Sequence, residues 1–532
     1  MGGRSIAASY SAMKMITSSP SSTMGRLLPW VTLGVMSYMY LVGELSHFLL
    51  GIVSRPMSQE LHYGDIACLP NPEAATQSDE CKEFDNKTEC LSLLEGDGDL
   101  TTTSPNNTVL TTCVWDYSGL GLAYQVLAGP AFVAVFTTAG VIISAIADRF
   151  NRKVVVTVCC GVLTFATGMT GAAMTYWQLV ILRMLMGAGE SSFTPVCSSM
   201  ISDLFPENLR ALALGIFNWG IYLGYGLSYA VGNFVTEADI GGLGWRWSYI
   251  ITGIMGVVAT LLALIIIRDP PRGMQAKKEE EEEEKAGKKD EVIGGGEEGS
   301  VEGDVKTSSS SASFPPASSS EALTDRKPGF KEVLRSLLKP PVVCLAFAAC
   351  LRHTAGFSWA YNTQLYFLTY YPDFNLGLWV TACSIIGGSL GVAVGGFVSD
   401  RLVKRLGLRA RLYVLAGSQL IATPFAAGVL YFPPPGAFFS LLGAYIFAEM
   451  WLGVLFAVLL ELVPGKVQST ALAVFLFVMN NVGGNLPVVV DPLTNLLSYR
   501  TALLIMYPGC YLASSVVFFL TSFLLREDTP KK

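Results

Sequence analysis

Long apolar runs separated by short polar turns dominate the pattern along this chain. A transmembrane helix needs about 20 predominantly apolar residues, so runs of this length predict membrane spans. Six of them precede a long polar segment and six follow it. They lie near residues 28–53, 119–147, 154–175, 177–203, 211–235 and 247–267, and then near 342–368, 378–399, 412–432, 437–463, 469–490 and 500–525.

The two sets of runs predict an all-α polytopic membrane protein with twelve transmembrane helices in two pseudo-symmetric six-helix bundles. The bundles are expected at residues 28–267 and 342–525, with short tails at 1–27 and 526–532. An even number of spans places both tails on one side, and basic residues in alternate turns mark that side as cytoplasmic. These residues are Arg149, Arg152, Lys153, Arg210, Arg401, Lys404, Arg405, Arg409, Arg411 and Lys466. Residues 1–25 contain little apolar sequence, so we expect the first run to remain as an anchor.

The polar segment at residues 54–118 has the composition of an extracellular or lumenal loop. It contains two N-glycosylation sequons and four cysteines, which fit an oxidising compartment. The residues are Asn86 and Asn106, and Cys68, Cys81, Cys90 and Cys113. Two disulfides are expected, and the sequence leaves three connectivities open.

A second polar segment, residues 268–341, separates the two sets of runs. It carries an acidic run at 277–285, a glycine-rich stretch and a serine-rich stretch. Such a composition buries too little apolar surface to fold, so we expect a disordered cytoplasmic linker, with a regulatory tail as the alternative.

The overall composition excludes several classes of protein. The chain has 532 residues, 51% of them hydrophobic and 15% charged, with a net charge of −6 that resides largely in the linker. No basic face for nucleic acid is present, and no G-x-S-x-G, H-E-x-x-H or Walker motif indicates an enzyme or an ATP-driven pump. The neighbouring Cys159 and Cys160 lack metal-ligand spacing, so no metal or other cofactor is expected.

Two charged residues stand inside the fourth apolar run. Arg183 and Glu190 lie about two helical turns apart and therefore share one face of a helix. A charge in the middle of a bilayer costs about 2.5 to 3.5 kcal/mol on insertion scales, so both side chains are expected to face a polar pathway. The alternative is an Arg–Glu clamp that fixes this helix to its neighbours.

Other polar residues in the apolar runs are candidates for a site near the middle of the membrane. They are Glu44 and His47 in the first run, Arg352 and His353 in the seventh, Glu449 in the tenth and Asn481 in the eleventh. A Glu190 whose distance to Arg183 changes between two conformations can load and release a proton, which makes H⁺ the expected coupling ion. Ordinary hydrogen-bonded packing is the alternative for each histidine.

One pattern of charges recurs in both halves. The turn after the second run contains Asp148, Arg149, Arg152 and Lys153, and the turn after the eighth contains Asp400, Arg401 and Arg405. Acids and bases in such tight turns can hold neighbouring helices in one conformation and release them in another, so we expect these residues to gate. Plain anchoring by positive charge is the alternative.

These turns resemble the G-x-x-x-D-R-x-x-R-K loop of the major facilitator superfamily, with Ser144 in place of the first glycine and Gly396 present in the second copy. Within that superfamily the chain resembles the Spinster family of lysolipid and sphingolipid transporters. The matching segments are Asp148–Lys153, Arg183-x-x-x-Gly187-x-Gly189-Glu190-Ser-Ser-Phe, Ser202–Phe205, Gly220, Gly224 and Gly226, Trp245-Arg-Trp247 and Arg268–Gly273. One departure is the first run, where Glu44-Leu-Ser-His47 replaces the family's Asp-Arg pair.

The resemblance implies a secondary transporter that works by alternating access on a lysophospholipid or sphingoid lipid. A facilitator of small organic anions is the alternative within transport, and a non-transporting receptor or scaffold is the alternative outside it. We expect a monomer surrounded by membrane lipid, in the plasma membrane or in late endosomes and lysosomes.

Overall fold

A computed structural model gives the structure of the chain. It describes residues 23–70, 81, 87, 90, 102–103, 109–110, 113–271, 330–372, 374–464 and 468–525. Asn86, Asn106, Lys466, the acidic run, residues 1–22 of the first tail and the whole second tail lie outside the described residues. Residues 23–27, predicted as tail, are already helical.

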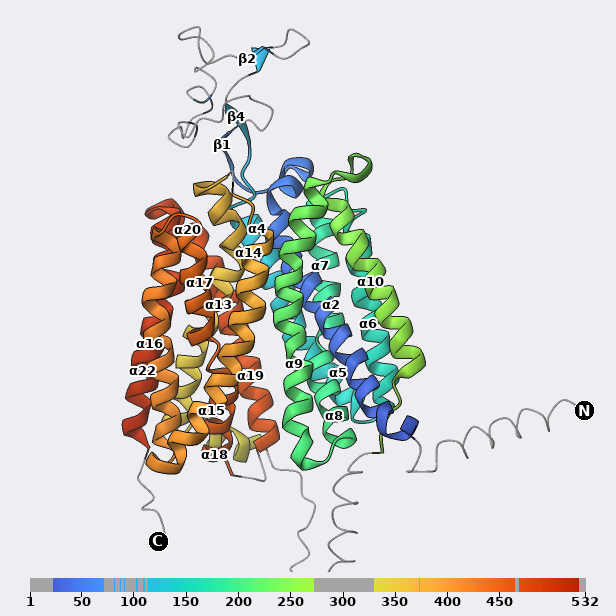
Figure 1. Cartoon of the computed structure of the whole chain (residues 1–532), viewed down its shortest axis with the longest axis vertical. Helices are drawn as coiled ribbons and strands as arrows, with labels where there is room; N and C mark the ends of the chain where they lie inside the picture. The colour runs from blue at the N-terminus through green and yellow to red at the C-terminus, as the bar shows by residue number, and fades with distance from the viewer. Residues whose placement is uncertain are drawn as a thin grey trace, which may run out of the picture.

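The first bundle is formed by the helices that precede the linker (Figure 1). They are α2 (Thr23–Leu61), α4 (Leu122–Ala128), α5 (Pro130–Ala147), α6 (Arg152–Thr170), α7 (Tyr176–Glu190), η2 (Phe193–Cys197), α8 (Ser198–Leu204), α9 (Glu207–Ala230), η3 (Val231–Val235), η4 (Ile240–Gly242) and α10 (Trp245–Ile266).

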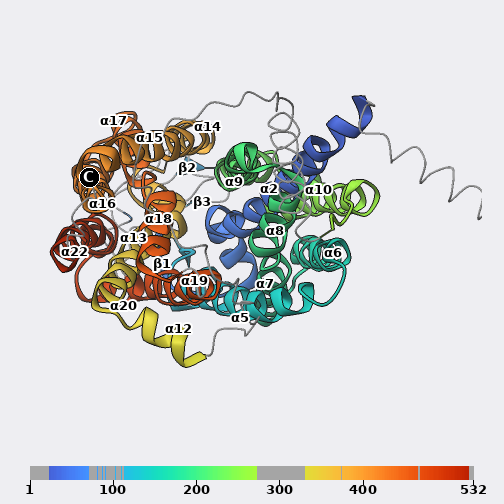
Figure 2. The ribbon, with the colours of Figure 1, turned by 90° about the horizontal axis from the view of Figure 1, so that it is seen from below.

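The second bundle repeats this plan. Its helices are α13 (Pro340–Tyr370), α14 (Gly377–Ala382), η5 (Cys383–Gly388), α15 (Ser389–Leu406), α16 (Arg409–Tyr431), α17 (Gly436–Ala448), α18 (Leu452–Leu462), α19 (Gln468–Asn485), η7 (Leu486–Val489), α20 (Val490–Leu496), α21 (Tyr499–Leu504), η8 (Ile505–Gly509) and α22 (Cys510–Leu524). The two bundles stand side by side, as the views along and across the helices show (Figures 1 and 2).

Helices occupy all twelve predicted runs, and ten of them are long and apolar enough to cross a membrane. The fourth and fifth runs, α7–η2–α8 and α9–η3, are the other two. α7 ends after only 15 residues and contains Arg183 and Glu190. The all-α membrane fold is thus confirmed, and within the described residues the length and composition of the helices support ten spans.

The fourth helix of each bundle is interrupted at a glutamate. In the first bundle, α7 ends at Glu190 and the π-helical turn η2 follows. Pro195 lies within η2 and has no N–H to donate, which disrupts the regular ladder of hydrogen bonds there. In the second bundle, α17 ends at Ala448, Glu449 caps it, and α18 begins at Leu452.

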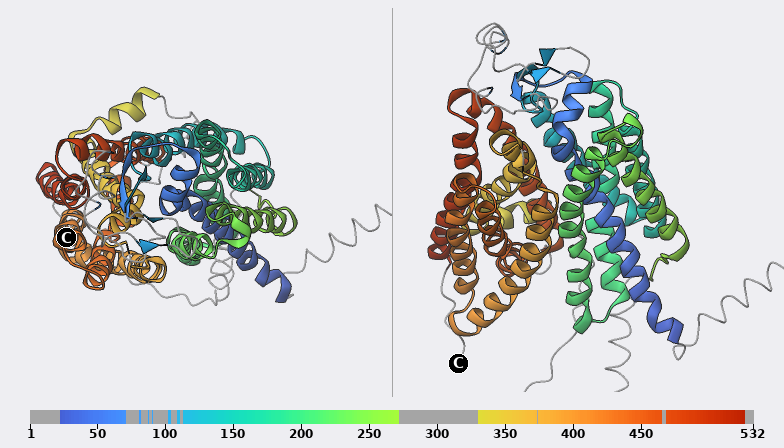
Figure 3. Two further views of the ribbon diagram at one scale, coloured as in Figure 1. Left: turned by 90° about the horizontal axis from the view of Figure 1, so that it is seen from above. Right: turned by 45° about the horizontal axis from the view of Figure 1, so that its top comes forward.

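The predicted outer loop projects from one end of the molecule, here called the loop end (Figure 3). Strand β1 (Ile66–Pro70) pairs antiparallel with β4 (Cys113–Tyr117), and β2 (Thr102–Thr103) pairs with β3 (Val109–Leu110). Disulfides join Cys68 to Cys90 and Cys81 to Cys113, which confirms that two form and selects one of the three connectivities.

The opposite end of the molecule, here called the tail end, is where α2 begins and α22 ends (Figure 1). The predicted linker folds near this end over its last residues. Helix α12 (Phe330–Leu337) packs against α19, and α13 already begins at Pro340. The expectation of disorder up to residue 341 is therefore wrong for this part, because Leu337 packs onto the apolar core of the second bundle. Residues 272–329 of the linker are not described.

The hydrogen bonds that join the bundles gather toward the loop end. Near that end the Tyr124 hydroxyl donates to the backbone carbonyl of Tyr361, and Gln125 donates to Asn362 at 3.1 Å. Asn233 and Gln364 exchange side-chain hydrogen bonds at 2.9 and 3.3 Å. The loop end therefore holds the two bundles together in this conformation.

Candidate functional site

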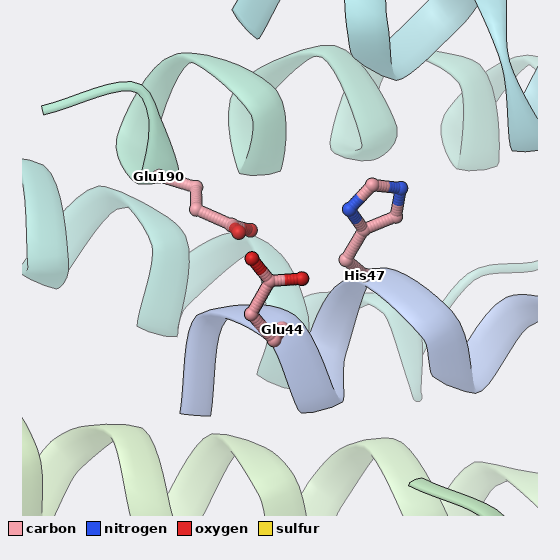
Figure 4. Close-up of side chains that lie close together, drawn as sticks. All are labelled: Glu44, His47 and Glu190. Atoms are coloured by element: carbon pink, nitrogen blue, oxygen red, sulfur yellow. The ribbon is translucent and has the colours of Figure 1, made fainter. Parts of the chain in front are cut away.

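Three polar side chains predicted for the site meet inside the first bundle. Glu44 and His47 come from α2 and Glu190 from the end of α7 (Figure 4). One ligand atom of each lies within 4.8 Å of the other two. Their exposed fractions are 9%, 5% and 3%. Glu190 lies about 21 Å from the loop end of α7, which places the cluster near mid-depth.

Glycines let the helices approach closely around this cluster. A Cβ on Gly43 would stand 3.2 Å from the Glu190 side chain, and one on Gly224 of α9 would stand 2.7 Å from Cβ of Glu44. A contact of 2.7 Å is too short for a real Cβ. Residue 224 must therefore be glycine if α9 is to pack against the α2 turn that carries the acid.

Arg183 lies on the same face of α7 but bonds to backbone rather than to an acid. Its guanidinium donates to the carbonyls of His47 at 2.9 Å, Leu127 at 3.2 Å and Ser46 at 3.4 Å. Among the described residues no ion pair joins it to Glu190. Arg183 thereby fixes the turn of α2 that carries His47. It donates no hydrogen bond to the carboxylate of Glu44 or Glu190 among the described contacts.

Aromatic rings hold the imidazole of His47. It stacks on Phe132 and Phe48 with centroid distances of 3.9 and 4.5 Å. Nε2 of His47 and Oε2 of Glu190 are both buried without a hydrogen-bond partner. Buried polar atoms are almost always paired in proteins, so these two are unusual.

A second cluster stands at the corresponding place in the other bundle. Arg352 of α13 forms an ion pair with Glu449, Nη2 to Oε1, at 2.7 Å. It also donates to the carbonyl of Ala448 at 2.9 Å, which the break between α17 and α18 leaves free. The guanidinium lies 4.2 Å from the ring centroid of Trp451. Nε of Arg352 is buried and has no partner.

A row of rings links the two clusters. The centroid of Phe357 on α13 lies 6.1 Å from that of His47 and 4.6 Å from that of His353. His353 in turn lies 6.0 Å from Trp451, the ring beneath Arg352. His353 therefore packs among aromatic rings between the clusters.

Contacts between the bundles continue at mid-depth. The Tyr222 hydroxyl of α9 donates to Oε2 of Glu449 at 3.2 Å. Asn481 of α19 donates to the Thr137 hydroxyl of α5 at 2.7 Å. Asn481, singled out from the sequence, thus joins the two bundles.

Arg152 is the centre of the turn that is predicted to gate in the first bundle. The buried guanidinium donates to Asp203 at 2.7 Å, to Asp269 at 2.8 Å and to the carbonyl of Pro270 at 2.7 Å. Asp148 and Arg149 are exposed and Lys153 is half-buried. One arginine therefore ties the start of α6 to the end of α8 and to the segment after α10.

The second gating turn centres on a different arginine from those predicted. Arg411, at the start of α16, lies 3.2 Å from Glu461 and 4.0 Å from Asp400. Arg401 lies over the Phe397 ring at 4.9 Å, and Arg405 is exposed. Arg411 of α16 thus takes the place that Arg152 has on α6.

Sequence reasoning assigned no role to Asp203, Asp269, Glu461, Arg411 or Tyr222 in these contacts. The sequence did contain an indication for Asp203 and Asp269, because both lie in segments that resemble the Spinster family. For Glu461 the signal was an acid at the tail end of a fourth helix, the place that Asp203 has in the first bundle.

Two helical bundles with a charged cluster near the middle of each are the architecture of a two-bundle membrane transporter. Residues 36–487 match the model of the Major Facilitator Superfamily. The chain belongs to this superfamily, whose members are transporters rather than enzymes.

The relatives of this chain include Spinster proteins, as the sequence motifs indicated. It is 36% identical over 146 residues to the sphingosine-1-phosphate transporter SPNS2 of Danio rerio, and this alignment covers 27% of this chain and 28% of that protein. It is 33% identical over 146 residues to protein spinster homolog 1 of Homo sapiens, with 27% of each chain covered. The alignments thus span about a quarter of each relative.

The whole fold resembles that of a bacterial homologue of the human lysosomal transporter Spinster, solved in an inward-facing and unoccupied conformation. The superposition has a TM-score of 0.61 at 16% identity and covers 93% of this chain and 97% of the other. A second crystal structure of a bacterial Spinster homologue, inward-facing and occupied, gives a TM-score of 0.59.

Proposed function

We propose that this protein is a secondary transporter that moves a lysophospholipid or a sphingoid lipid across a membrane by alternating access. The observation that carries the proposal is the presence of one charged cluster per bundle near mid-depth, with a row of aromatic rings between them. An amphiphile offers both a polar head for the charges and an apolar chain for the rings.

Arg352 is the residue best suited to an anionic head group. An arginine binds phosphate or carboxylate through paired, charge-assisted hydrogen bonds, and its buried Nε has no partner in this conformation. Its present partner, Glu449, has a side chain that is 18% exposed, so the pair is not fully enclosed. The resemblance to a sphingosine-1-phosphate transporter supports this choice of substrate class.

Alternating access requires that the contacts between the bundles break at one end of the molecule while equivalent contacts form at the other end. In this conformation the bundles are joined at the loop end and at mid-depth by Gln125–Asn362, Asn233–Gln364, Tyr222–Glu449 and Thr137–Asn481. We infer that the tail end is the one open here, and that Arg152 and Arg411 hold its turns in this state.

The tail end is assigned to the cytoplasm, with both termini there, on the distribution of basic residues. The disulfide-bonded loop then faces the cell exterior or an endolysosomal lumen, and Asn86 and Asn106 carry sugars. Coupling to protons and a monomeric state remain predictions from the sequence.

Transport by purified protein in proteoliposomes tests the proposal. Labelled sphingosine-1-phosphate and lysophosphatidylcholine would be compared with a panel of small organic anions, with and without an imposed pH gradient. Saturable lipid flux that falls in Arg352→Gln is the expected result. Anion flux without lipid flux would favour the facilitator, and no flux of either kind would favour a receptor or scaffold.

A further inference from the structure

The cluster of Glu44, His47 and Glu190 has the composition of a metal site, which lipid transport does not require. Two buried carboxylates and one imidazole converge from α2 and α7 with their ligand atoms within 4.8 Å of one another. We propose that these three side chains bind one divalent transition-metal ion, of the class of Zn²⁺ or Mn²⁺. This inference goes beyond the proposed function and does not depend on the substrate.

The geometry is close to that of a bound ion. Nitrogen and oxygen ligands lie about 2.0 to 2.2 Å from Zn²⁺, which places two tetrahedral ligand atoms about 3.4 Å apart. The three donors lie within 4.8 Å of one another and so need to approach by at most about 1.4 Å, which the rotatable bonds of the glutamates allow. One ring nitrogen of His47 already faces the two carboxylates, and the other faces away (Figure 4).

The unpaired atom in the cluster points to a ligand. Oε2 of Glu190 is buried without a hydrogen-bond partner, and the residue is 3% exposed. The figure shows this carboxylate directed at that of Glu44 across the gap between α7 and α2 (Figure 4). An ion between them would satisfy the orphaned oxygen.

Charge also favours a divalent ion. Two carboxylates so close together in a medium of low dielectric repel each other strongly, and a 2+ ion makes the set neutral. The nearby cation, Arg183, directs its hydrogen bonds at three backbone carbonyls instead. Those bonds hold the turn of α2 that presents His47, so Arg183 is a positioning residue for the donor set.

The types of donor select the ion. An imidazole with two carboxylates suits Zn²⁺, Mn²⁺ or Fe²⁺, whereas Ca²⁺ and Mg²⁺ prefer oxygen donors alone. Three protein ligands leave a fourth position open, as in zinc sites that exchange a water molecule. His47 is held by stacking on Phe48 and Phe132, which orients the ring without a hydrogen bond to its outer nitrogen.

Equilibrium binding of Zn²⁺ to the purified full-length protein, carrying no histidine tag, tests the inference. One saturable site per chain is expected, with Ca²⁺ unable to compete. Glu190→Gln, Glu44→Gln and His47→Ala should each weaken binding by about tenfold or more, since even the loss of a residue that supports a ligand costs this much. The two glutamine variants keep the side-chain size, and gel filtration would report whether each variant folds.

Two matched controls separate this site from other donors. His353→Ala removes a histidine of the other bundle, and Cys160→Ser removes a buried thiol. Both should bind Zn²⁺ as the wild type does, and X-ray absorption should show nitrogen and oxygen ligands without sulfur. Absence of saturable binding, sulfur ligation, or binding unchanged in folded Glu190→Gln and His47→Ala would overturn the proposal.

Discussion

Tyr222 of the first bundle donates its hydroxyl to Glu449 of the second at 3.2 Å, and the same carboxylate pairs with Arg352 at 2.7 Å. Glu449 therefore belongs both to the charged cluster of its own bundle and to the contact between bundles. Any anion that replaces Glu449 on Arg352 would change that contact as well. The arrangement offers a direct route from head-group binding to the relative position of the bundles.

Removal of the Tyr222 hydroxyl should loosen the bundles at mid-depth. A hydrogen bond to a charged group contributes about 1.5 to 3 kcal/mol, so Tyr222→Phe should shift the equilibrium between conformations by about tenfold or more. Distances between spin labels at the tail ends of the two bundles would report the shift. Tyr38→Phe is the matched control, because that hydroxyl donates to the carbonyl of Met255 within the first bundle. An equal effect in both variants would assign the change to packing.

The stability of the protein should fall when one partner of the Arg352–Glu449 pair is removed, and should fall much less when both are replaced by apolar residues. Removing one member of a buried pair leaves an uncompensated charge and costs about 3 to 5 kcal/mol, whereas an apolar replacement of both is often neutral. In thermal unfolding, Glu449→Leu should therefore be less stable than the double variant Arg352→Met, Glu449→Leu. Glu461→Ala is a control in which the acid of the pair, Glu461, is exposed, and it should cost no more than about 1 kcal/mol. A double variant as unstable as the single one would contradict this account.

Arg152 should be the most sensitive residue of the gating turns. Its guanidinium joins α6 to Asp203 and Asp269 by a planar fork that lysine cannot reproduce. Arg152→Lys should therefore increase protease accessibility at the tail end and lower flux nearly as much as Arg152→Ala. The neighbouring Arg149→Ala changes an exposed side chain and should leave both measurements unchanged. Wild-type protease resistance and wild-type flux in Arg152→Lys would show that a positive charge at this position is enough to hold the turn.

The disulfide Cys81–Cys113 should stabilise the outer loop without supporting the bundles. It closes a loop with a sequence separation of 32, for which chain entropy predicts about 3.7 kcal/mol. The double variant Cys81→Ser, Cys113→Ser should be cleaved faster in the loop by limited proteolysis. Lipid flux should persist, because the bundle contacts lie outside this segment. Loss of binding to a partner with no transport in either form would favour the receptor alternative.

The helices and their order could be predicted from the sequence because each long apolar run carries its own signal. The breaks within the runs could be predicted less well. Pro195 indicates the interruption after Glu190, but no proline stands between α17 and α18, where the chain leaves the helix at Glu449. The two disulfide pairings also required the fold, since spacing alone is compatible with three.

The buried charged residues that form the two clusters could be identified from the sequence, whereas their contact partners could not. Buried charges in apolar runs identified Glu44, His47, Arg183, Glu190, Arg352 and Glu449 one at a time. Which acid meets which base depends on how helices distant in sequence pack, as in the separation of 97 residues between Arg352 and Glu449. Arg183 likewise donates to backbone carbonyls and not to Glu190 because of where α2 lies, which the sequence does not show.

The fourth helix of each bundle stops at a glutamate, yet the two glutamates have different surroundings. Glu449 meets a permanent positive charge, while Glu190 meets a second acid and an imidazole. The break in the fourth helix is thus present in both bundles with different surroundings. Glu449 forms an ion pair with an arginine, whereas Glu190 forms no ion pair among the described residues. If a lipid head group binds Arg352 and a metal ion binds Glu190, as proposed above, the two ligands would act at equivalent breaks, one in the fourth helix of each bundle.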